Sequence, residues 1–217
     1  MEKKTKSIAI GLGILALGGF IYTQLPTGSG HDSMMSMNAS SGESPSTKAF
    51  ETAMGAMMKR MMATPTAKPD LDFMQGMMPH HQGAIDMAKV VLQYGKDAEV
   101  KTLAQAVIKA QEGEIALMKD WMTKTDQTKL PMVPASKEAN DQAMATMMKN
   151  MMTPYSGDAD VDYVRGMIPH HQGAIDMAKA ALKYGQDPTV LKLAQDVVTA
   201  QEGEIKFMTD WLKKKGM

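Results

Sequence analysis

Cysteine is missing from this 217-residue chain, and so is any net charge, because 24 acidic residues balance 24 basic ones. The absence of cysteine excludes disulfides, zinc fingers, iron–sulfur clusters, thiol catalysis and a lipid-bearing anchor cysteine. Any metal ion would therefore be bound by His, Met, Asp, Glu or the backbone. The balanced charge provides no attraction to a polyanion, so we expect no nucleic-acid partner.

Motifs of several enzyme classes are also missing. The sequence has no Glu-x-x-His pair for a di-iron bundle, no His-Glu-x-x-His and no serine nucleophile elbow. It also lacks a carboxylate cluster at the loop spacing that Ca²⁺ or Mg²⁺ requires. We therefore expect a protein that is not an enzyme. Two alternatives stay open, namely a ferritin-like, metal-dependent redox enzyme and a methionine-rich module that binds partners or absorbs oxidants.

The start of the chain has the pattern of an export signal. Lys3, Lys4 and Lys6 precede an apolar run over residues 8–25. No clear small-x-small cleavage site follows, and the run is just long enough to span a bilayer, so residues 1–27 are predicted to be a signal peptide or a signal anchor. We expect the rest to be periplasmic or secreted, with membrane contact only through this segment if it stays uncleaved.

A polar arm is predicted over residues 28–46, which are rich in Ser, Gly and Asn and favour a flexible segment. The arm nevertheless contains one histidine and three closely spaced methionines, namely His31, Met34, Met35 and Met37. Packing cannot explain these apolar side chains in a polar segment. Metal binding is therefore the favoured interpretation of this group.

The remaining chain is a tandem duplication. Residues 53–124 match residues 143–214 at a constant offset of 90 without a gap, so that Trp121 corresponds to Trp211. We predict one repeat over residues 47–124, a proline-containing linker over 125–136 and a second repeat over 137–217. The two repeats are expected to have the same fold.

Each repeat is predicted to contain three helices. The second helix is expected to begin after Asp70 (Asp160), an N-cap residue type, and to end at Gly95 (Gly185). The third helix is expected to begin at Asp97. No alternating strand pattern occurs, so the predicted fold is all-α, with two tandem helical-bundle repeats.

Methionine is unusually common, with 25 residues, roughly twice as many as leucine, which is normally among the commonest residues. The first helix of each repeat carries a methionine stripe at helical spacing. Such a stripe usually packs in a core, but its thioethers are also candidate metal ligands. These candidates are Met54, Met58, Met61, Met144, Met148 and Met151.

Adjacent histidines occur in "GMMPHHQGAIDMAK" from Gly76 and in "GMIPHHQGAIDMAK" from Gly166. On a helical wheel, His81 lies at the centre of the apolar face, and His80 lies about 100° away at its margin. If only one histidine of each pair binds a metal ion at an accessible site, the margin position favours His80 and His170. His81 is interpreted either as a core histidine or as a group that supports the site.

A glutamate lies in the middle of the apolar face of each third helix. Glu114 in the first repeat corresponds to Glu204 in the second. A buried carboxylate requires a partner that is positively charged or donates a hydrogen bond. We therefore predict that Glu114 pairs with His81 and that Glu204 pairs with His171.

Methionine and histidine without cysteine favour copper. Thioethers are soft ligands suited to Cu(I), with Ag(I) as a mimic, and imidazole binds either copper oxidation state. An exported location fits, because thiols are prone to oxidation there. We expect a protein that sequesters or hands over Cu(I). A copper transporter or efflux component is a possible partner for the handover.

The two histidine strings, with "QEGEIALMKDW" from Gln111 and its copy from Gln201, resemble the family known as domain of unknown function 305. The resemblance covers most of the chain after the arm. It implies an exported, helical, ferritin-like protein that binds copper, Cu(I) in particular, and contributes to copper resistance. By motif match it extends to Met77, His80, His81, Met87, Met167, His170, His171 and Met177.

Overall fold

The computed structural model describes residues 44–62 and 64–217, and this part contains only helical secondary structure. The elements are α1 (Pro45–Arg60), α2 (Pro69–Tyr94), α3 (Ala98–Lys124), the short 3₁₀ helix η1 (Gln127–Lys129), α4 (Pro134–Asn150), α5 (Ala159–Tyr184) and α6 (Pro188–Lys214). The all-α prediction is confirmed for these residues. The predicted export signal and the arm with His31, Met34, Met35 and Met37 lie outside them.

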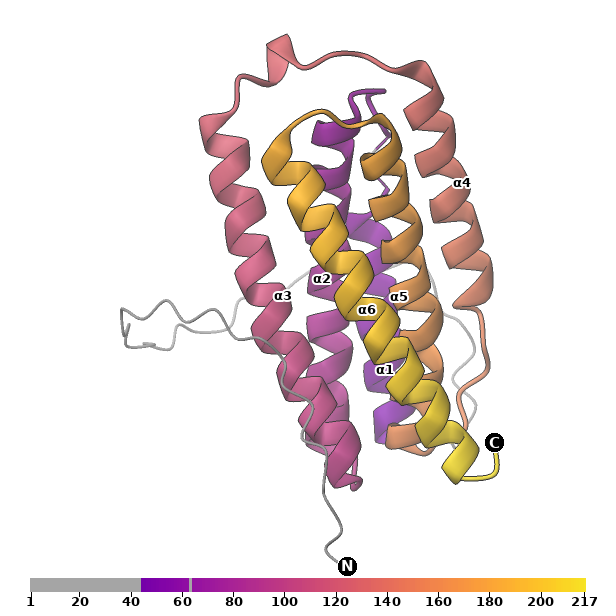
Figure 1. Ribbon diagram of the computed structural model, residues 1–217. Helices are drawn as coiled ribbons and strands as arrows, with labels where there is room; N and C mark the ends of the chain where they lie inside the picture. Colours follow the sequence, from indigo (N-terminus) through magenta and orange to yellow (C-terminus); the bar gives the residue numbers. More distant parts are fainter. Residues whose placement is uncertain (1–43, 63) are drawn as a thin grey trace, which may run out of the picture. The chain divides into compact units, whose positions relative to one another are not determined.

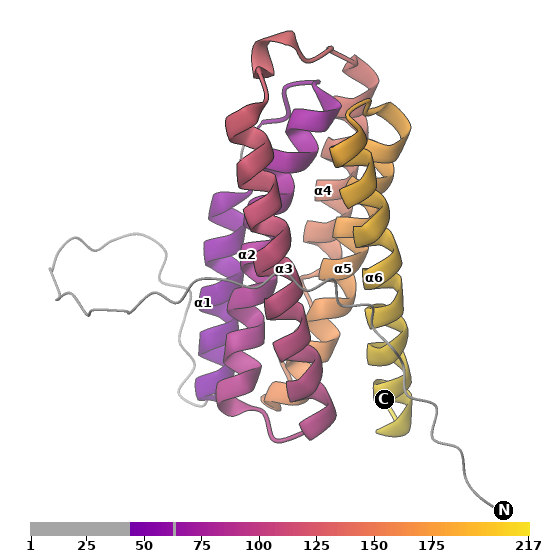
Figure 2. The same ribbon diagram turned by 60° about the vertical axis from the view of Figure 1, so that its left-hand side comes forward.

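The helices of the described part run along one long axis, with α2 and α5 in the middle (Figures 1 and 2). Helices α1 and α3 pack on α2, whereas α4 and α6 pack on α5, and α2 packs directly against α5. These helices belong to a single compact unit, so the two repeats share one core. Each repeat thereby provides the apolar cover for the central helix of the other.

Several helix boundaries follow local capping chemistry. Asp97 precedes α3, and its side chain accepts hydrogen bonds from the backbone N–H groups of Glu99 and Val100. Asp187 caps α6 in the same way, with Pro188 at the first helical position. The predicted starts of both third helices are confirmed, because an aspartate N-cap depends only on the residues beside it.

The predicted N-cap role of Asp70 is wrong. Helix α2 begins two residues earlier, after Lys68, and the Asp70 carboxylate instead reaches the turn between α5 and α6. There it accepts hydrogen bonds from the backbone N–H groups of Gln186 and Asp187. The start of a helix leaves such donors without a helical partner. The docking of the other repeat, rather than the local sequence, therefore determines the role of this aspartate.

Asp160, the counterpart of Asp70, is also not the N-cap of its own helix, since that position belongs to Asp158. Its carboxylate accepts hydrogen bonds from the backbone N–H groups of Lys96 and Asp97, in the turn between α2 and α3. Gly95 ends α2 as predicted, and a β-carbon at this position would collide with the Asp160 carboxylate. The start of each central helix thus meets the end of the other, so α2 and α5 are antiparallel.

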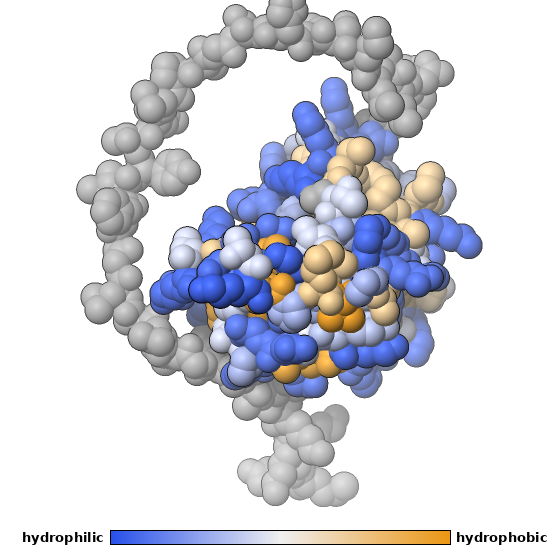
Figure 3. Space-filling view, turned by 90° about the horizontal axis from the view of Figure 1, so that it is seen from above, coloured by the Kyte–Doolittle hydropathy of each residue, from blue (hydrophilic) through white to orange (hydrophobic). Residues whose placement is uncertain are grey.

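The outside of the unit is predominantly polar at the end that carries η1 and the α5–α6 turn. Figure 3 shows this end from above, with hydrophilic residues over most of it and apolar residues in small separate groups. Among the described residues, no helix combines the length and the apolar character that a membrane crossing requires.

Candidate metal centre

Two histidines meet where α2 and α5 pack together. His80 lies against its own counterpart, His170, with ring centroids 3.8 Å apart and the ring planes inclined by 45°. Both residues are fully buried. The prediction of an accessible site at the margin of one helix face is therefore wrong. A helical wheel describes a single helix, whereas in the structure the second repeat covers the margin of the helix face on the first.

Both of these rings favour the neutral form at physiological pH. Burial is the main reason why the pKa of His80 and that of His170 fall well below the usual histidine value, and neighbouring histidines lower them further. Neither ring nitrogen of either residue has a hydrogen-bond partner among the described residues. A neutral imidazole with an unpartnered nitrogen is the form that binds metal ions.

The second histidine of each pair contacts a glutamate, as the sequence predicts. Nε2 of His81 lies 2.5 Å from Oε2 of Glu114, and Nε2 of His171 lies 2.6 Å from Oε2 of Glu204. The rings are fully buried, whereas each glutamate side chain is 22% exposed. A proton on Nε2 suits this contact and leaves Nδ1 with its lone pair, and Nδ1 has no partner among the described residues.

The four rings form one cluster between α2 and α5. Ring centroids are 6.2 Å apart for His80 and His81 and 6.1 Å apart for His170 and His171. Carboxylate contacts orient the outer two rings, in the manner common for metal-binding histidines. Within residues 44–62 and 64–217, no three His, Asp or Glu side chains gather in a metal-binding arrangement. Thioethers are therefore the donors to consider next.

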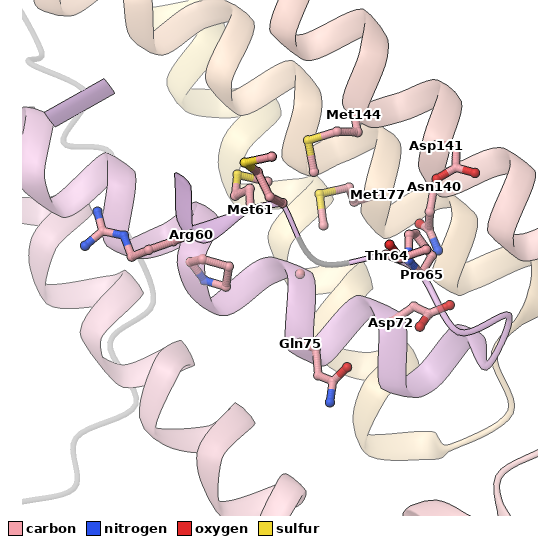
Figure 4. Close-up of a pocket in the computed structure, with 13 residues that line it drawn as sticks. Arg60, Met61, Thr64, Pro65, Asp72, Gln75, Asn140, Asp141, Met144 and Met177 are labelled. Atoms are coloured by element: carbon pink, nitrogen blue, oxygen red, sulfur yellow. The ribbon is translucent and has the colours of Figure 1, made fainter. Parts of the chain in front are cut away.

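Methionines from both repeats gather at two related clefts. Cleft 1 is lined by Met61 after α1, Met144 of α4 and Met177 of α5. Figure 4 shows these three side chains directed toward one another. Cleft 2 is lined by their counterparts at the offset of 90, which are Met151, Met54 and Met87. The sequence identifies each of these methionines but not their combination across the repeats.

Four other candidate methionines lie outside the two clefts. Met77 and Met167 are fully buried in the core, while Met58 and Met148 are partly buried, and Met148 packs against the core. The sequence analysis missed Asp72, which lines cleft 1 and has one unpartnered, buried carboxylate oxygen. The signal that could have indicated the clefts is the constant offset, because antiparallel docking of equal repeats pairs equivalent positions.

The fold and these donors define a helical protein in which two repeats share a buried histidine cluster and two methionine clefts. The chain belongs to the family described as domain of unknown function 305 (DUF305), whose family model matches residues 70–212. The matched region contains both histidine pairs and their glutamate partners.

Solved structures support the same relationship. The chain is 34% identical to CopM in the Cu(I)-bound form, with a TM-score of 0.52, and the match covers 67% of this chain and 96% of that one. CopM in an Ag-bound form is 33% identical, with a TM-score of 0.53 and coverages of 70% and 98%. A DUF305 protein from Streptomyces coelicolor, described as a candidate secreted protein, is 31% identical, with a TM-score of 0.55 and coverages of 70% and 95%.

One curated relative also matches. It is the uncharacterized protein L153 of Acanthamoeba polyphaga mimivirus, which is 39% identical over 56 residues. The match covers 26% of this chain and 37% of that relative, so this chain spans little more than a third of its length.

Proposed function

We propose that this protein is an exported copper-binding protein that sequesters or hands over Cu(I) and thereby contributes to copper resistance. The observation that carries the proposal is the similarity to CopM, which has been solved with Cu(I), Cu(II) and Ag bound and matches over nearly its whole length. We further propose a ferritin-like arrangement of the helices and an export signal over residues 1–27.

The chemistry of the donors supports this choice of metal. Thioethers bind Cu(I) and Ag(I) but have little affinity for hard ions such as Mg²⁺. Neutral imidazoles accept both copper oxidation states, and the buried ring nitrogens of His80 and His170 have no other partner among the described residues. We propose His80, His170 and the methionines of at least one of the two clefts as ligands. The residues of the arm, His31, Met34, Met35 and Met37, are proposed as a separate site.

We also propose that the protein performs no redox turnover. In a carboxylate-bridged two-metal enzyme, glutamates from several helices bind the metal ions directly. Here the central glutamates contact the outer histidines instead, with Glu114 on His81 and Glu204 on His171. This arrangement orients imidazoles and suits binding. A copper transporter or efflux component would receive the ion.

Titration of the full chain with Cu(I) against a competing chelator tests the proposal. We expect the chain to remove Cu(I) from the chelator and to leave Zn²⁺ and Mg²⁺ largely unbound under the same conditions. His80→Ala with His170→Ala should lower the stoichiometry or the affinity for Cu(I), with the far-ultraviolet circular dichroism spectrum largely unchanged. Gln82→Ala with Gln172→Ala is the matched control, because it changes the next residue after each histidine pair, where neither side chain is a proposed ligand.

Two results would contradict the proposal. If the chain fails to compete for Cu(I) at all, it is not a copper-binding protein. If it consumes oxygen catalytically with Cu(I) or Fe(II), the enzyme alternative is correct. Unchanged binding by the double histidine variant would remove His80 and His170 from the site while leaving copper binding intact.

A further inference from the structure

The two methionine clefts are equivalent in sequence but differ in space. Cleft 1 encloses a cavity of about 270 Å³, whereas the cavity of cleft 2 is about 20 Å³. Three methionines correspond, since each cleft has one from the end of an outer helix, one from the other outer helix and one from a central helix. The difference therefore lies in the residues around the methionines.

Two aromatic rings fill cleft 2. Phe50 and Tyr155 both line it and stack on each other, with ring centroids 6.0 Å apart and planes inclined by 13°. Phe50 is 1% exposed. Burial, together with nearby carboxylates, raises the pKa of Tyr155 to about 12. Their counterparts in cleft 1 are Asn140 and Pro65, which are smaller. Replacement of two rings by these side chains leaves the open volume.

Cleft 1 also contains a carboxylate oxygen without a partner. Oδ1 of Asp72 accepts hydrogen bonds from Thr66, but Oδ2 is buried and has no partner among the described residues. In cleft 2, Oδ2 of the counterpart Asp162 accepts a hydrogen bond of 3.0 Å from the backbone N–H of Gly157. A buried, unsatisfied carboxylate oxygen favours a cation nearby.

The positively charged side chains that line the two clefts also favour cation binding in cleft 1. Cleft 2 is lined by Arg165, and the corresponding residue of cleft 1 is the neutral Gln75. Cleft 1 is also lined by Arg60, but its guanidinium lies 2.6 Å from the carboxylate of Asp86, which compensates its charge. A metal cation therefore meets less repulsion in cleft 1.

The surroundings of the methionines differ in two further ways. A β-carbon on Gly76 would lie only 2.9 Å from the terminal methyl of Met177, so the lack of a side chain at Gly76 leaves room for this methyl. Gly166, the counterpart, has no such neighbour. Met62 lines the same cleft and is 82% exposed, which places a further thioether within reach of solvent.

We propose that cleft 1, in contrast to cleft 2, binds a monovalent soft cation, Cu(I) or Ag(I). The sulfurs of Met61, Met144 and Met177 are the ligands, and Asp72 balances the charge. Cleft 2 is its closed copy and binds none. This assignment rests on the proposed copper function and names one of its sites. Because the three ligands come from both repeats, the ion also links α4 and α5 to the end of α1.

Nuclear magnetic resonance of the full chain labelled with [methyl-¹³C]methionine and titrated with Ag(I) tests the assignment site by site. Ag(I) is diamagnetic, so bound thioethers remain observable, and single Met→Leu variants assign their signals. We expect the methyl signals of Met61, Met144 and Met177 to shift. The signals of the matched set, Met54, Met87 and Met151, should stay in place until the protein is saturated.

Variants provide the second measurement, by native mass spectrometry with Ag(I) and by Cu(I) competition. Met61→Leu, Met144→Leu and Met177→Leu together conserve volume and should lose one bound ion. The matched control, Met151→Leu, Met54→Leu and Met87→Leu together, should lose none. Asn140→Phe places a ring where cleft 2 has Phe50, and should also lose one ion although every methionine is retained.

The outcomes separate the two proposals. If wild-type protein binds neither Cu(I) nor Ag(I), the copper function itself is wrong. If it binds Ag(I) while the cleft 1 signals do not shift, or while both methionine sets shift equally, only the assignment of cleft 1 is wrong. Equal loss of ions in the two triple variants would contradict it in the same way.

Discussion

The burial of His80 and His170 leads to a quantitative prediction of how the free energy of unfolding depends on pH. In the folded protein burial lowers the pKa of His80 and of His170 well below 6.5, whereas both titrate normally once the chain unfolds. The folded state then binds fewer protons than the unfolded state below pH 6.5. The contribution of these two histidines to the free energy of unfolding is fully present above pH 6.5 and is lost as the pH falls through that value.

The size of the effect follows from proton linkage. A group that is protonated only in the unfolded state lowers the free energy of unfolding by at most about 1.36 kcal/mol per pH unit below its unfolded pKa. For two histidines that stay neutral in the folded protein, the loss between pH 7.5 and pH 5.5 is about 2.7 kcal/mol. The double variant His80→Leu with His170→Leu has no such loss.

Urea unfolding of metal-free protein, followed by circular dichroism at several pH values, measures this difference. Carboxylates also contribute, and Asp70 does so with the opposite sign, because burial raises its pKa. They contribute alike to wild type and variant, so the difference between the two curves isolates the two histidines. Parallel curves between pH 7.5 and 5.5 would refute the reasoning and indicate that the rings are protonated or hydrated in the folded state.

Two further predictions concern stability and use the same urea assay. In Gly83→Ala the new β-carbon would meet the side chain of buried Met57, including the Met57 β-carbon at 3.0 Å. This overpacking should lower the free energy of unfolding by about 1–3 kcal/mol. The higher helix propensity of alanine offsets about 1 kcal/mol of that loss. Gly113→Ala meets nothing within 4 Å and should stabilise by up to about 1 kcal/mol, so equal effects of the two variants would contradict the packing argument. Asp70→Ala leaves the backbone N–H of Gln186 without its hydrogen bonds to the Asp70 carboxylate and should cost about 1–3 kcal/mol, and an unchanged free energy of unfolding would show that water replaces the carboxylate.

Local patterns correctly predict a large part of the fold. The methionine stripe of the first repeat predicts a helical face that packs in the core, and Met61 lies in the core while Met54 packs against it. Asp97 caps α3, and Gly95 ends α2. These features depend on residues within one or two turns of each other, so a single repeat contains the information. The pairing of His81 with Glu114 is predictable for a related reason, since a buried carboxylate requires a donor.

The candidate site is predicted less completely, because its geometry comes from contacts between residues about 90 positions apart. His80 is a margin residue on its own helix but is fully buried once α5 covers it, against His170. Asp70 is a residue type that favours the N-cap position, but its carboxylate instead accepts hydrogen bonds from the turn before α6. No local pattern contains these partners.

The sequence by itself determines the helical repeats, their duplication and the supply of thioether and imidazole donors, because composition and periodicity are properties of the chain. Only the tertiary structure decides which donors meet. Antiparallel docking of α2 against α5 brings each central helix to its copy, places His80 against His170, and combines methionines of both repeats in each cleft. It also makes the two clefts unequal, because differences as small as Phe50 for Asn140 decide whether a cleft is filled or open.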